Sequence, residues 1–185
     1  LLTERGVDQA QVLLSMFDKD GNPYMGDPRQ VLQALVNRFI ERELRPCMAV
    51  ELEFNLLPKP ETSEAIGAAL RDQNAVGGNL YALSELDYHG PLLEALRQAF
   101  DTQDLPYEGI IKESAPSQFE INVAHSDDVM LLADQVIRMQ RTIRAVSARH
   151  GFVASFMPKP IDDEAGNGLH VHCSLLDENG TNVFD

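Results

Sequence analysis

Apolar and polar residues alternate in several short stretches of the chain, and a period of two is typical of β-strands. In the stretch MAVELEFNLL, residues 48–57, the alternation places three apolar side chains on one face and the carboxylates of Glu51 and Glu53 on the other. The same pattern predicts a strand or a strand pair in four further stretches: residues 12–17, 107–123, 152–160 and 169–177. The second of these contains a proline turn, which predicts two short strands.

Apolar residues three and four positions apart predict amphipathic helices in three stretches: residues 26–44, 90–103 and 128–149, the last ended by Gly151. Asp27 is placed to cap the first helix, with Pro28 at its first helical position. Residues 56–87 give mixed signals, and the pair Gly77 and Gly78 predicts a flexible loop there.

Composition is that of a globular protein, with 185 residues, 44% hydrophobic and 24% charged. The net charge of −14 argues against binding to nucleic acid or to an anionic membrane, and favours divalent cations or cationic amines as partners. There are two cysteines without a CxxC motif, and we see no secretory leader, which together predict a cytoplasmic protein. No apolar run approaches the roughly 20 residues that span a bilayer.

The carboxylate pair of Glu51 and Glu53 has two interpretations. Taken alone, it is explained most simply by a half-solvated strand whose polar face meets water. The alternative is a metal site, because a buried carboxylate needs a partner or a cation. A second pair, Glu113 and Glu120 in ESAPSQFE, would converge if two strand ends bracket a tight turn, although a solvated Glu113 is an equal alternative.

Two histidines in GLHVHCSL provide a third group. His170 and His172 are two residues apart, so on a strand they share one face. A single histidine there would more often be a hydrogen-bonded core residue, but two of them after the small-residue stretch AGNG favour a ligand cluster. Imidazole together with several carboxylates suits Mn²⁺ or Mg²⁺ better than a thiolate-bound zinc.

The stretches ELEF, ESAPSQFE and KPIDDEAGNGLHVHCS resemble, in order and spacing, the metal-binding and ATP-binding motifs of the glutamine synthetase family. GDPRQVL and HGFVASFMPKP are similar to two further family segments, so the resemblance covers nearly the whole chain. The last metal-binding and ATP-binding motif is the most specific, since its Lys-Pro, small-residue loop, histidine and serine rarely coincide.

The resemblance implies a set of site residues. Glu53, Glu113 and Glu120 would bind one divalent ion, Mg²⁺ or Mn²⁺. Glu51 and His170 would bind a second ion, whose remaining ligand in the family lies beyond Asp185. Near ATP and glutamate the resemblance implies three more residues: His172 and Ser174 at the nucleotide, and Gly166 in the loop that holds glutamate.

The implied activity is an ATP-dependent ligation of the γ-carboxylate of glutamate to an amine through a γ-glutamyl phosphate. QNAVGGNLYALSELD and APSQFEIN look closer to the γ-glutamylpolyamine synthetase branch, which uses amines such as putrescine, than to the ammonia-using enzymes. Glu113 would be the catalytic carboxylate between the metal and the amine. Ser117 and Ala165 depart from the glycine and asparagine that are usual at these positions. A glutamine synthetase using ammonia and a catalytically silent relative remain alternatives.

For architecture the resemblance implies an α+β fold, with a curved, mostly antiparallel sheet of the glutamine synthetase catalytic-domain type, backed by helices. Residues 1–25 are expected to be the tail of an N-terminal β-grasp-like domain, and residues 26–185 part of the catalytic domain. Both ends of the sheet are expected to be incomplete, and the isolated chain inactive and prone to associate. The full-length protein is expected to form a homo-oligomer of stacked rings.

Overall fold

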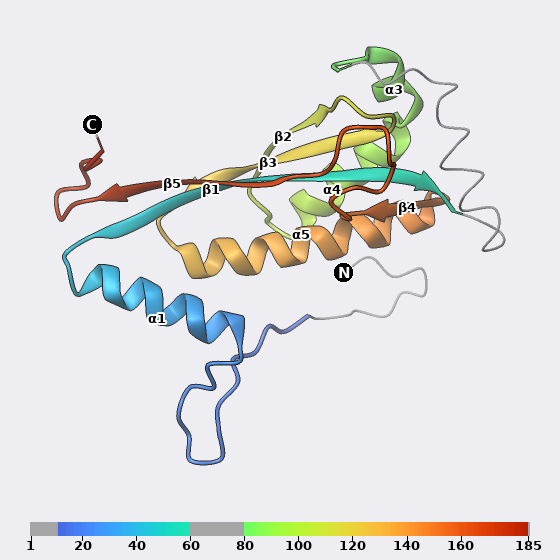
Figure 1. The fold of residues 1–185 in the computed structure, drawn as a ribbon. Helices are drawn as coiled ribbons and strands as arrows, with labels where there is room; N and C mark the ends of the chain where they lie inside the picture. The colour runs from blue at the N-terminus through green and yellow to red at the C-terminus, as the bar shows by residue number, and fades with distance from the viewer. Residues whose placement is uncertain (1–10, 60–79, 185) are drawn as a thin grey trace. The chain divides into compact units, whose positions relative to one another are not determined.

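Helices and strands are interspersed along the chain (Figure 1). The fold was obtained as a computed structural model, which describes residues 11–59 and 80–184. The elements are α1 (Pro28–Ile40), β1 (Arg45–Pro58), α3 (Leu83–Tyr88), α4 (Gly90–Thr102), β2 (Tyr107–Lys112), β3 (Gln118–Ser126), α5 (Val129–Arg149), β4 (Phe152–Ser155) and β5 (Leu169–Leu176). Gly77 and Gly78 lie outside the described residues. Within those residues, no helix combines the length and the apolar character needed to cross a membrane.

The strands form one five-stranded sheet in the order β2-β3-β1-β4, with β5 also paired to β1. β1 and β4 are antiparallel, and Asn55 faces Ser155 in their register. β2 and β3 are antiparallel as well, with Ile111 opposite Glu120. The sheet is not closed into a barrel, so the predicted α+β class with a mostly antiparallel sheet is confirmed.

Contacts between residues divide the chain into two compact units. In described residues, the first unit comprises 11–49, 125–136 and 171–184, and the second comprises 50–59, 80–124 and 137–170. The division passes through β1, β3, α5 and β5, each of which contributes residues to both units. Each unit is described by itself below.

The second unit has a tightly packed apolar core. Phe54 of β1 is fully buried, and its ring centroid lies 6.2 Å from that of Phe119 and 5.6 Å from that of Phe156. Leu96 and Phe100 of α4 are fully buried too, as their spacing along a helix predicts. The predicted apolar face of β1 is therefore confirmed, and Gly151, at φ +82°, follows α5 as expected of a helix-ending glycine.

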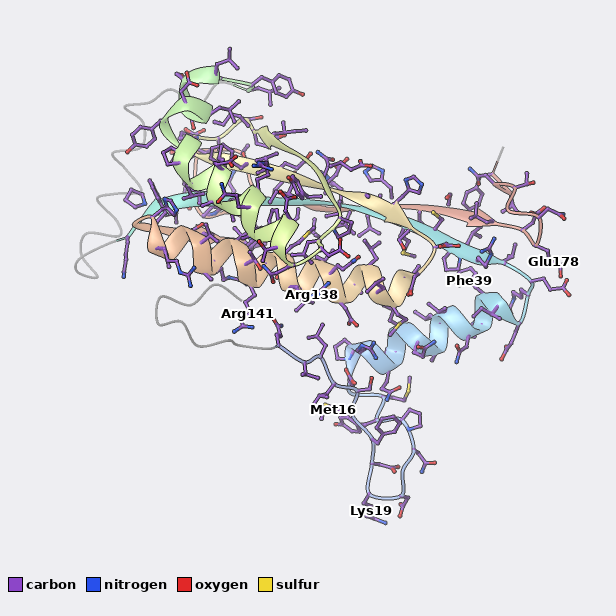
Figure 2. The ribbon with its side chains drawn as sticks, turned by 180° about the vertical axis from the view of Figure 1, so that it is seen from behind. Met16, Lys19, Phe39, Arg138, Arg141 and Glu178 are labelled. Atoms are coloured by element: carbon purple, nitrogen blue, oxygen red, sulfur yellow. The ribbon has the colours of Figure 1, made fainter. Side chains whose placement is uncertain are left out.

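The first unit begins with an irregular segment where the alternation at residues 12–17 predicts a strand. That prediction is wrong, because the segment makes one isolated bridge, between Phe17 and Pro23. Between these residues a turn closes with Asp18 N donating to Asn22 O at 2.8 Å, and Lys19 lies at its tip (Figure 2). Alternation alone does not make a strand, since a strand also needs a neighbour for its backbone hydrogen bonds.

Helix α1 of the first unit begins where the sequence predicts. The Asp27 side chain accepts hydrogen bonds from Arg29 N at 3.0 Å and from Met16 N at 2.9 Å, and Pro28 occupies the first turn. Arg29 also binds both carboxylate oxygens of Asp134, at 3.1 and 3.0 Å. Most of the predicted apolar stripe stays accessible, including Leu35 at 42% exposure.

Candidate metal centre

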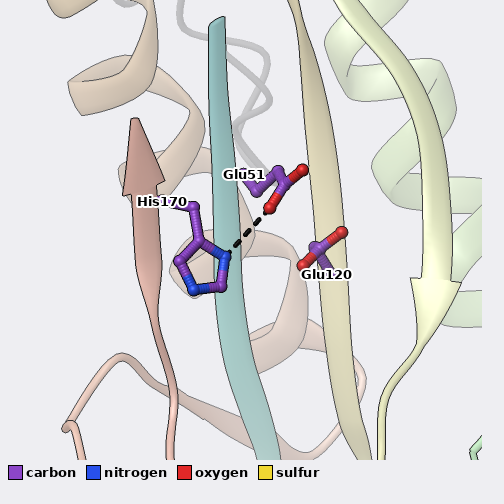
Figure 3. A group of neighbouring side chains, drawn as sticks. All are labelled: Glu51, Glu120 and His170. Carbon is purple, nitrogen blue, oxygen red and sulfur yellow. Dashed lines mark hydrogen bonds and ion pairs between the residues drawn. The ribbon is translucent and has the colours of Figure 1, made fainter. Parts of the chain in front are cut away.

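Three side chains from three different strands meet on one face of the sheet within the second unit (Figure 3). Glu51 comes from β1, Glu120 from β3 and His170 from β5. Each offers one ligand atom, and these atoms all lie within 4.8 Å of one another. His170 Nδ1 and Glu51 Oε2 are 2.9 Å apart.

The strand order explains why these residues meet. β1 lies between β3 and β5 in the sheet, so side chains on the same face of all three strands become neighbours. The backbone ties β5 to β1 next to the group, because Glu53 N donates to Gly168 O at 3.2 Å. Glu51 and Glu53 are two residues apart on β1 and share this face.

Glu53 lies at the edge of the group and is almost fully buried, with 8% exposure. Its Oε1 is 3.7 Å from His170 Nδ1, and its Oε2 accepts a hydrogen bond from Gln118 Nε2 at 3.0 Å. The half-solvated strand therefore does not describe Glu53, whose carboxylate is withdrawn from water and held by the protein.

The carboxylates act on one another electrostatically. Burial raises the pKa of Glu120, and the charges of Glu51, Glu113 and Glu53 raise it further, against a lowering by the hydrogen bond from Asn122. A cation bound next to this carboxyl would offset the negative charges around it and so favour its charged form. Several oxygen donors with one imidazole fit Mg²⁺ or Mn²⁺, so the residues present suit the predicted ions.

The grouping differs in detail from the expected division between two ions. The close group joins Glu51 and His170, assigned to one ion, with Glu120, assigned to the other. Glu113 is not a member of this group, but its charge is one of those that raise the Glu120 pKa. The assignment of Glu53, Glu113 and Glu120 to a single ion stays a prediction.

Gln118 is a site residue that the sequence reasoning missed. Its Nε2 lies within hydrogen-bonding distance of Glu53 Oε2 at 3.0 Å, Gly166 O at 2.9 Å and Asn167 Oδ1 at 3.1 Å. Its Oε1 accepts from Ala115 N at 2.9 Å. Gln118 thereby connects a carboxylate of the site to the glycine-rich loop. Its position two residues before Glu120, on the same face of a strand, is the signal that would have indicated it.

The glycine-rich loop approaches its surroundings too closely for larger residues. A Cβ on Gly166 would lie 2.3 Å from Pro158 O, and a Cβ on Gly168 would lie 3.0 Å from His170 Nε2 and 3.1 Å from Glu53 Oε1. Asn167 fixes the loop, since its Nδ2 donates to Met157 O at 2.9 Å. Gly166 is therefore required by its close approach to a backbone atom, whereas at Gly168 the ends of the His170 and Glu53 side chains would have to give by a few tenths of an ångström. The carbonyl oxygen of Gly166 accepts a hydrogen bond from Gln118 Nε2.

His172 and Ser174, predicted to lie near the nucleotide, belong to the first unit. Both line a surface hollow of about 280 Å³ together with Cys47, Ala49, His125 and Cys173. Ser174 Oγ is 3.5 Å from Cys47 O, and the His172 side chain is exposed. The structure thus places both predicted residues at an accessible concave surface.

Comparisons with known proteins agree with these features. Residues 25–185 match the glutamine synthetase catalytic domain. The chain is 34% identical over 178 residues to γ-glutamylputrescine synthetase of Escherichia coli K12, covering 94% of this chain and 38% of that protein. It is 33% identical to glutamine synthetase of Halobacterium salinarum over 175 residues, covering 95% of this chain and 37% of that protein. A solved GmaS/ADP complex is similar with a TM-score of 0.78 and 27% identity, over 90% of this chain and 37% of that one.

Proposed function

Because the chain belongs to the glutamine synthetase family, we propose that it forms part of the active site of an ATP-dependent ligase that joins glutamate to an amine. The γ-carboxylate of glutamate would first be phosphorylated by ATP, and the amine would then displace phosphate from the γ-glutamyl phosphate. One observation carries the proposal: Glu51, Glu120 and His170 present ligand atoms within 4.8 Å of one another. The chain spans under two fifths of these curated relatives, so the whole protein's activity is proposed by extension.

The acidic face of the sheet would hold the divalent ions. Glu51, Glu120 and His170 are the direct candidates, with Glu53 beside them and Glu113 close enough to act through its charge. Two bound ions, Mg²⁺ or Mn²⁺, would offset the repulsion between an anionic carboxylate and the phosphates of ATP. The protein contributes the fixed positions of these side chains, which lowers the reorganisation needed during the reaction.

The two substrates of the first step would contact residues already described. We propose that Gly166 and its loop hold glutamate, supported by the fixed orientation that Gln118 and Asn167 give to this loop. We propose that His172 and Ser174 contact ATP, supported by their place in an accessible hollow. The acidic face carries several negative charges close together, so it would attract the ammonium end of an amine.

For the amine we propose a polyamine such as putrescine. The similarity to γ-glutamylputrescine synthetase of E. coli supports this choice, as does the net charge of −14. A glutamate–isopropylamine ligase of a Pseudomonas species, 30% identical over 181 residues, is a further relative named for an amine other than ammonia. Ammonia is the second candidate, because the Halobacterium glutamine synthetase is almost as similar at 33% identity.

We further propose a setting for the whole protein. Residues 1–25 would belong to an N-terminal domain of the β-grasp type, and residues 26–185 to the catalytic domain. The full-length protein would be a cytoplasmic homo-oligomer of stacked rings. This chain by itself would be inactive, because the remaining metal ligand would come from outside it.

The test is a product assay on the full-length protein with glutamate, ATP and either putrescine, isopropylamine, ammonia or hydroxylamine. We expect γ-glutamyl amides by mass spectrometry, with the highest kcat/KM for putrescine. Wild-type preference for ammonia would overturn the polyamine proposal and leave a glutamine synthetase. Failure of every amine, while ATP and Mn²⁺ still bind, would support a silent relative.

A charge-removing variant separates the amines further. Glu113→Gln keeps the side-chain shape but removes a negative charge, so a dicationic polyamine should lose more kcat/KM than neutral hydroxylamine does. Saturating Mn²⁺ in every assay keeps weaker ion binding from being mistaken for loss of amine binding. Equal losses for both amines would mean that Glu113 does not face the amine.

A further inference from the structure

A buried cluster of charged and polar side chains contacts the turn between β2 and β3, and the proposed reaction makes no use of it. Its members are Glu85 of α3, His89 at the start of α4 and Lys112 of β2, with exposures of 2%, 2% and 1%. Charged groups are costly to bury unless they are paired and hydrogen-bonded. The groups that pair with these three side chains therefore indicate the role of the cluster.

Lys112 directs its ammonium group at the turn. Its Nζ donates to Ala115 O at 2.7 Å and to the carbonyl of Glu113, and it lies 3.5 Å from Glu85 Oε1. Two hydrogens of the ammonium group go to these carbonyls, and Glu85 balances its charge as an ion pair. The positive charge thus joins a helix carboxylate to two carbonyls of the turn at residues 113–117.

Ser117 is held in an unusual backbone conformation by the same cluster. Its φ of +50° lies in the left-handed region, which is unfavourable for a residue with a Cβ atom. Ser117 N donates to Glu85 Oε2 at 2.7 Å, its Oγ is 3.2 Å from His89 Nε2, and its O accepts from Leu56 N at 2.8 Å. Burial, and then the Lys112 charge, lower the pKa of His89 to about 4, so this contact uses a neutral imidazole at neutral pH.

The turn connects Glu113, which directly follows β2, and Glu120 of β3 to the rest of the site. Glu113 opens it, and Glu113 N donates to Gln118 O at 2.9 Å across its base. Gln118 then binds Glu53 and the glycine-rich loop, and Glu120 follows two residues later on the same face. Any shift of the turn would therefore move several candidate ligands at once.

We infer that Glu85, Lys112 and Ser117 are positioning residues, which clamp the turn at residues 113–117 so that neighbouring carboxylates stay close enough to share a cation. Without such support, repulsion between the carboxylates would separate them before an ion arrives. Strained residues persist where the surrounding structure holds them, and they concentrate at functional sites, as Ser117 does here. The inference rests on the proposed function, because it assigns the clamp a role in metal binding.

The test compares stability with Mn²⁺ affinity in lysine-to-methionine variants. Lys112→Met leaves the Glu85 charge buried and unpaired, so both the urea midpoint and the Mn²⁺ affinity should fall, the affinity by about tenfold or more. Adding Glu85→Met removes the unpaired charge and should restore part of the midpoint, although Ser117 N then loses its acceptor. The affinity should stay low, because the turn carbonyls still lack their donor.

Controls make the comparison specific. Lys19→Met removes an exposed lysine that pairs with its neighbour Asp20, and it should change neither quantity. Ser117→Ala removes the hydroxyl contact to His89 with little loss of volume, and a few-fold loss of Mn²⁺ affinity is expected even if Lys112→Met fails to fold. Free Mn²⁺ is measured by electron paramagnetic resonance. Recovery of affinity together with stability in the double variant would overturn the inference, as would wild-type affinity in both single variants.

A metal-free measurement separates this inference from the proposed function. Hydrogen exchange at the amides of Glu113 and Gln118 should be at least tenfold faster in Lys112→Met than in wild type or Lys19→Met. If wild-type protein binds no Mn²⁺, the proposed function fails while the exchange result still decides whether the clamp exists. Unchanged exchange at these amides would overturn the clamp whatever the metal does.

Discussion

The apolar faces of α4 and α1 differ sharply in what covers them. In the second unit, Leu96 and Phe100 of α4 are fully buried. In the first unit, Leu35 and Ile40 of α1 are 42% and 58% exposed, and Gln30 is the buried residue of that helix. Both helices have amphipathic sequences, so the difference lies in packing. Helix α4 is stabilised by its core, whereas α1 depends on its cap and on the Arg29 ion pair.

The largest expected effect is in the packed unit. Phe54→Ala should lower the free energy of unfolding by about 3–5 kcal/mol, because it leaves a cavity beside Phe119 and Phe156. Urea denaturation followed by circular dichroism measures the change. A loss below about 1 kcal/mol would mean that the core relaxes around the missing ring and that the contrast between the units is weaker than their burial indicates.

Gly166→Ala is expected to have the next largest effect. The new Cβ would lie 2.3 Å from Pro158 O, a backbone atom that cannot move without its loop. Overpacking of this kind costs about 1–3 kcal/mol, and Mn²⁺ affinity should fall as Gln118 loses its contact with Gly166 O. Gly109→Ala is the matched control, since a Cβ there has no atom within 4 Å. Equal stability and affinity in the two variants would contradict the close-approach argument.

Distance along the chain explains which features could be predicted from the sequence. The Asp27 cap and the apolar face of β1 follow from patterns of neighbouring residues, and both are confirmed. The strand at residues 12–17 needed a distant partner, which alternation cannot reveal. The same holds for the contact between Lys112 and Glu85, 27 residues apart in sequence by their numbering. Only the folded sheet brings such residues together.

The candidate site could be predicted only in part. Motif resemblance identified Glu51, Glu120 and His170, which the strand order brings together. Gln118 was missed because an isolated glutamine carries no charge or metal-ligand pattern, and its importance depends on three acceptors from separate segments. How the acidic residues divide between two ions depends on the ions themselves, so that part stays a prediction.

In the less packed unit, the helix cap should matter most. Asp27→Ala removes the acceptor for Arg29 N and Met16 N, and should lower the free energy of unfolding by about 1 kcal/mol. Asp27→Asn, which retains a side-chain oxygen at the cap, should recover most of the loss. The helical signal at 222 nm during urea unfolding reports both. If Asp27→Asn is no better than Asp27→Ala, capping is not what stabilises α1.

The acidic site should make the second unit sensitive to pH. The pKa of Glu120 is raised above its ordinary value of 4.5, so the folded chain holds this proton more tightly than the unfolded chain does. This contribution to stability is present at low pH and is lost as pH rises through the folded pKa. Without metal, the urea midpoint should therefore fall less with rising pH in Glu120→Gln than in wild type. Parallel pH profiles would contradict the repulsion described here.

The smallest effect is expected at the exposed face of α1. Leu35→Ala should change the free energy of unfolding by less than about 0.5 kcal/mol, because a side chain that is 42% exposed loses little burial on truncation. Leu35→Lys tests the other consequence of exposure, since accessible apolar surface promotes association. Light scattering should show less self-association for Leu35→Lys than for Leu35→Ala, at similar stability in urea. A large loss of stability in both variants would mean that α1 is covered in solution, and the contrast between α1 and α4 would then disappear.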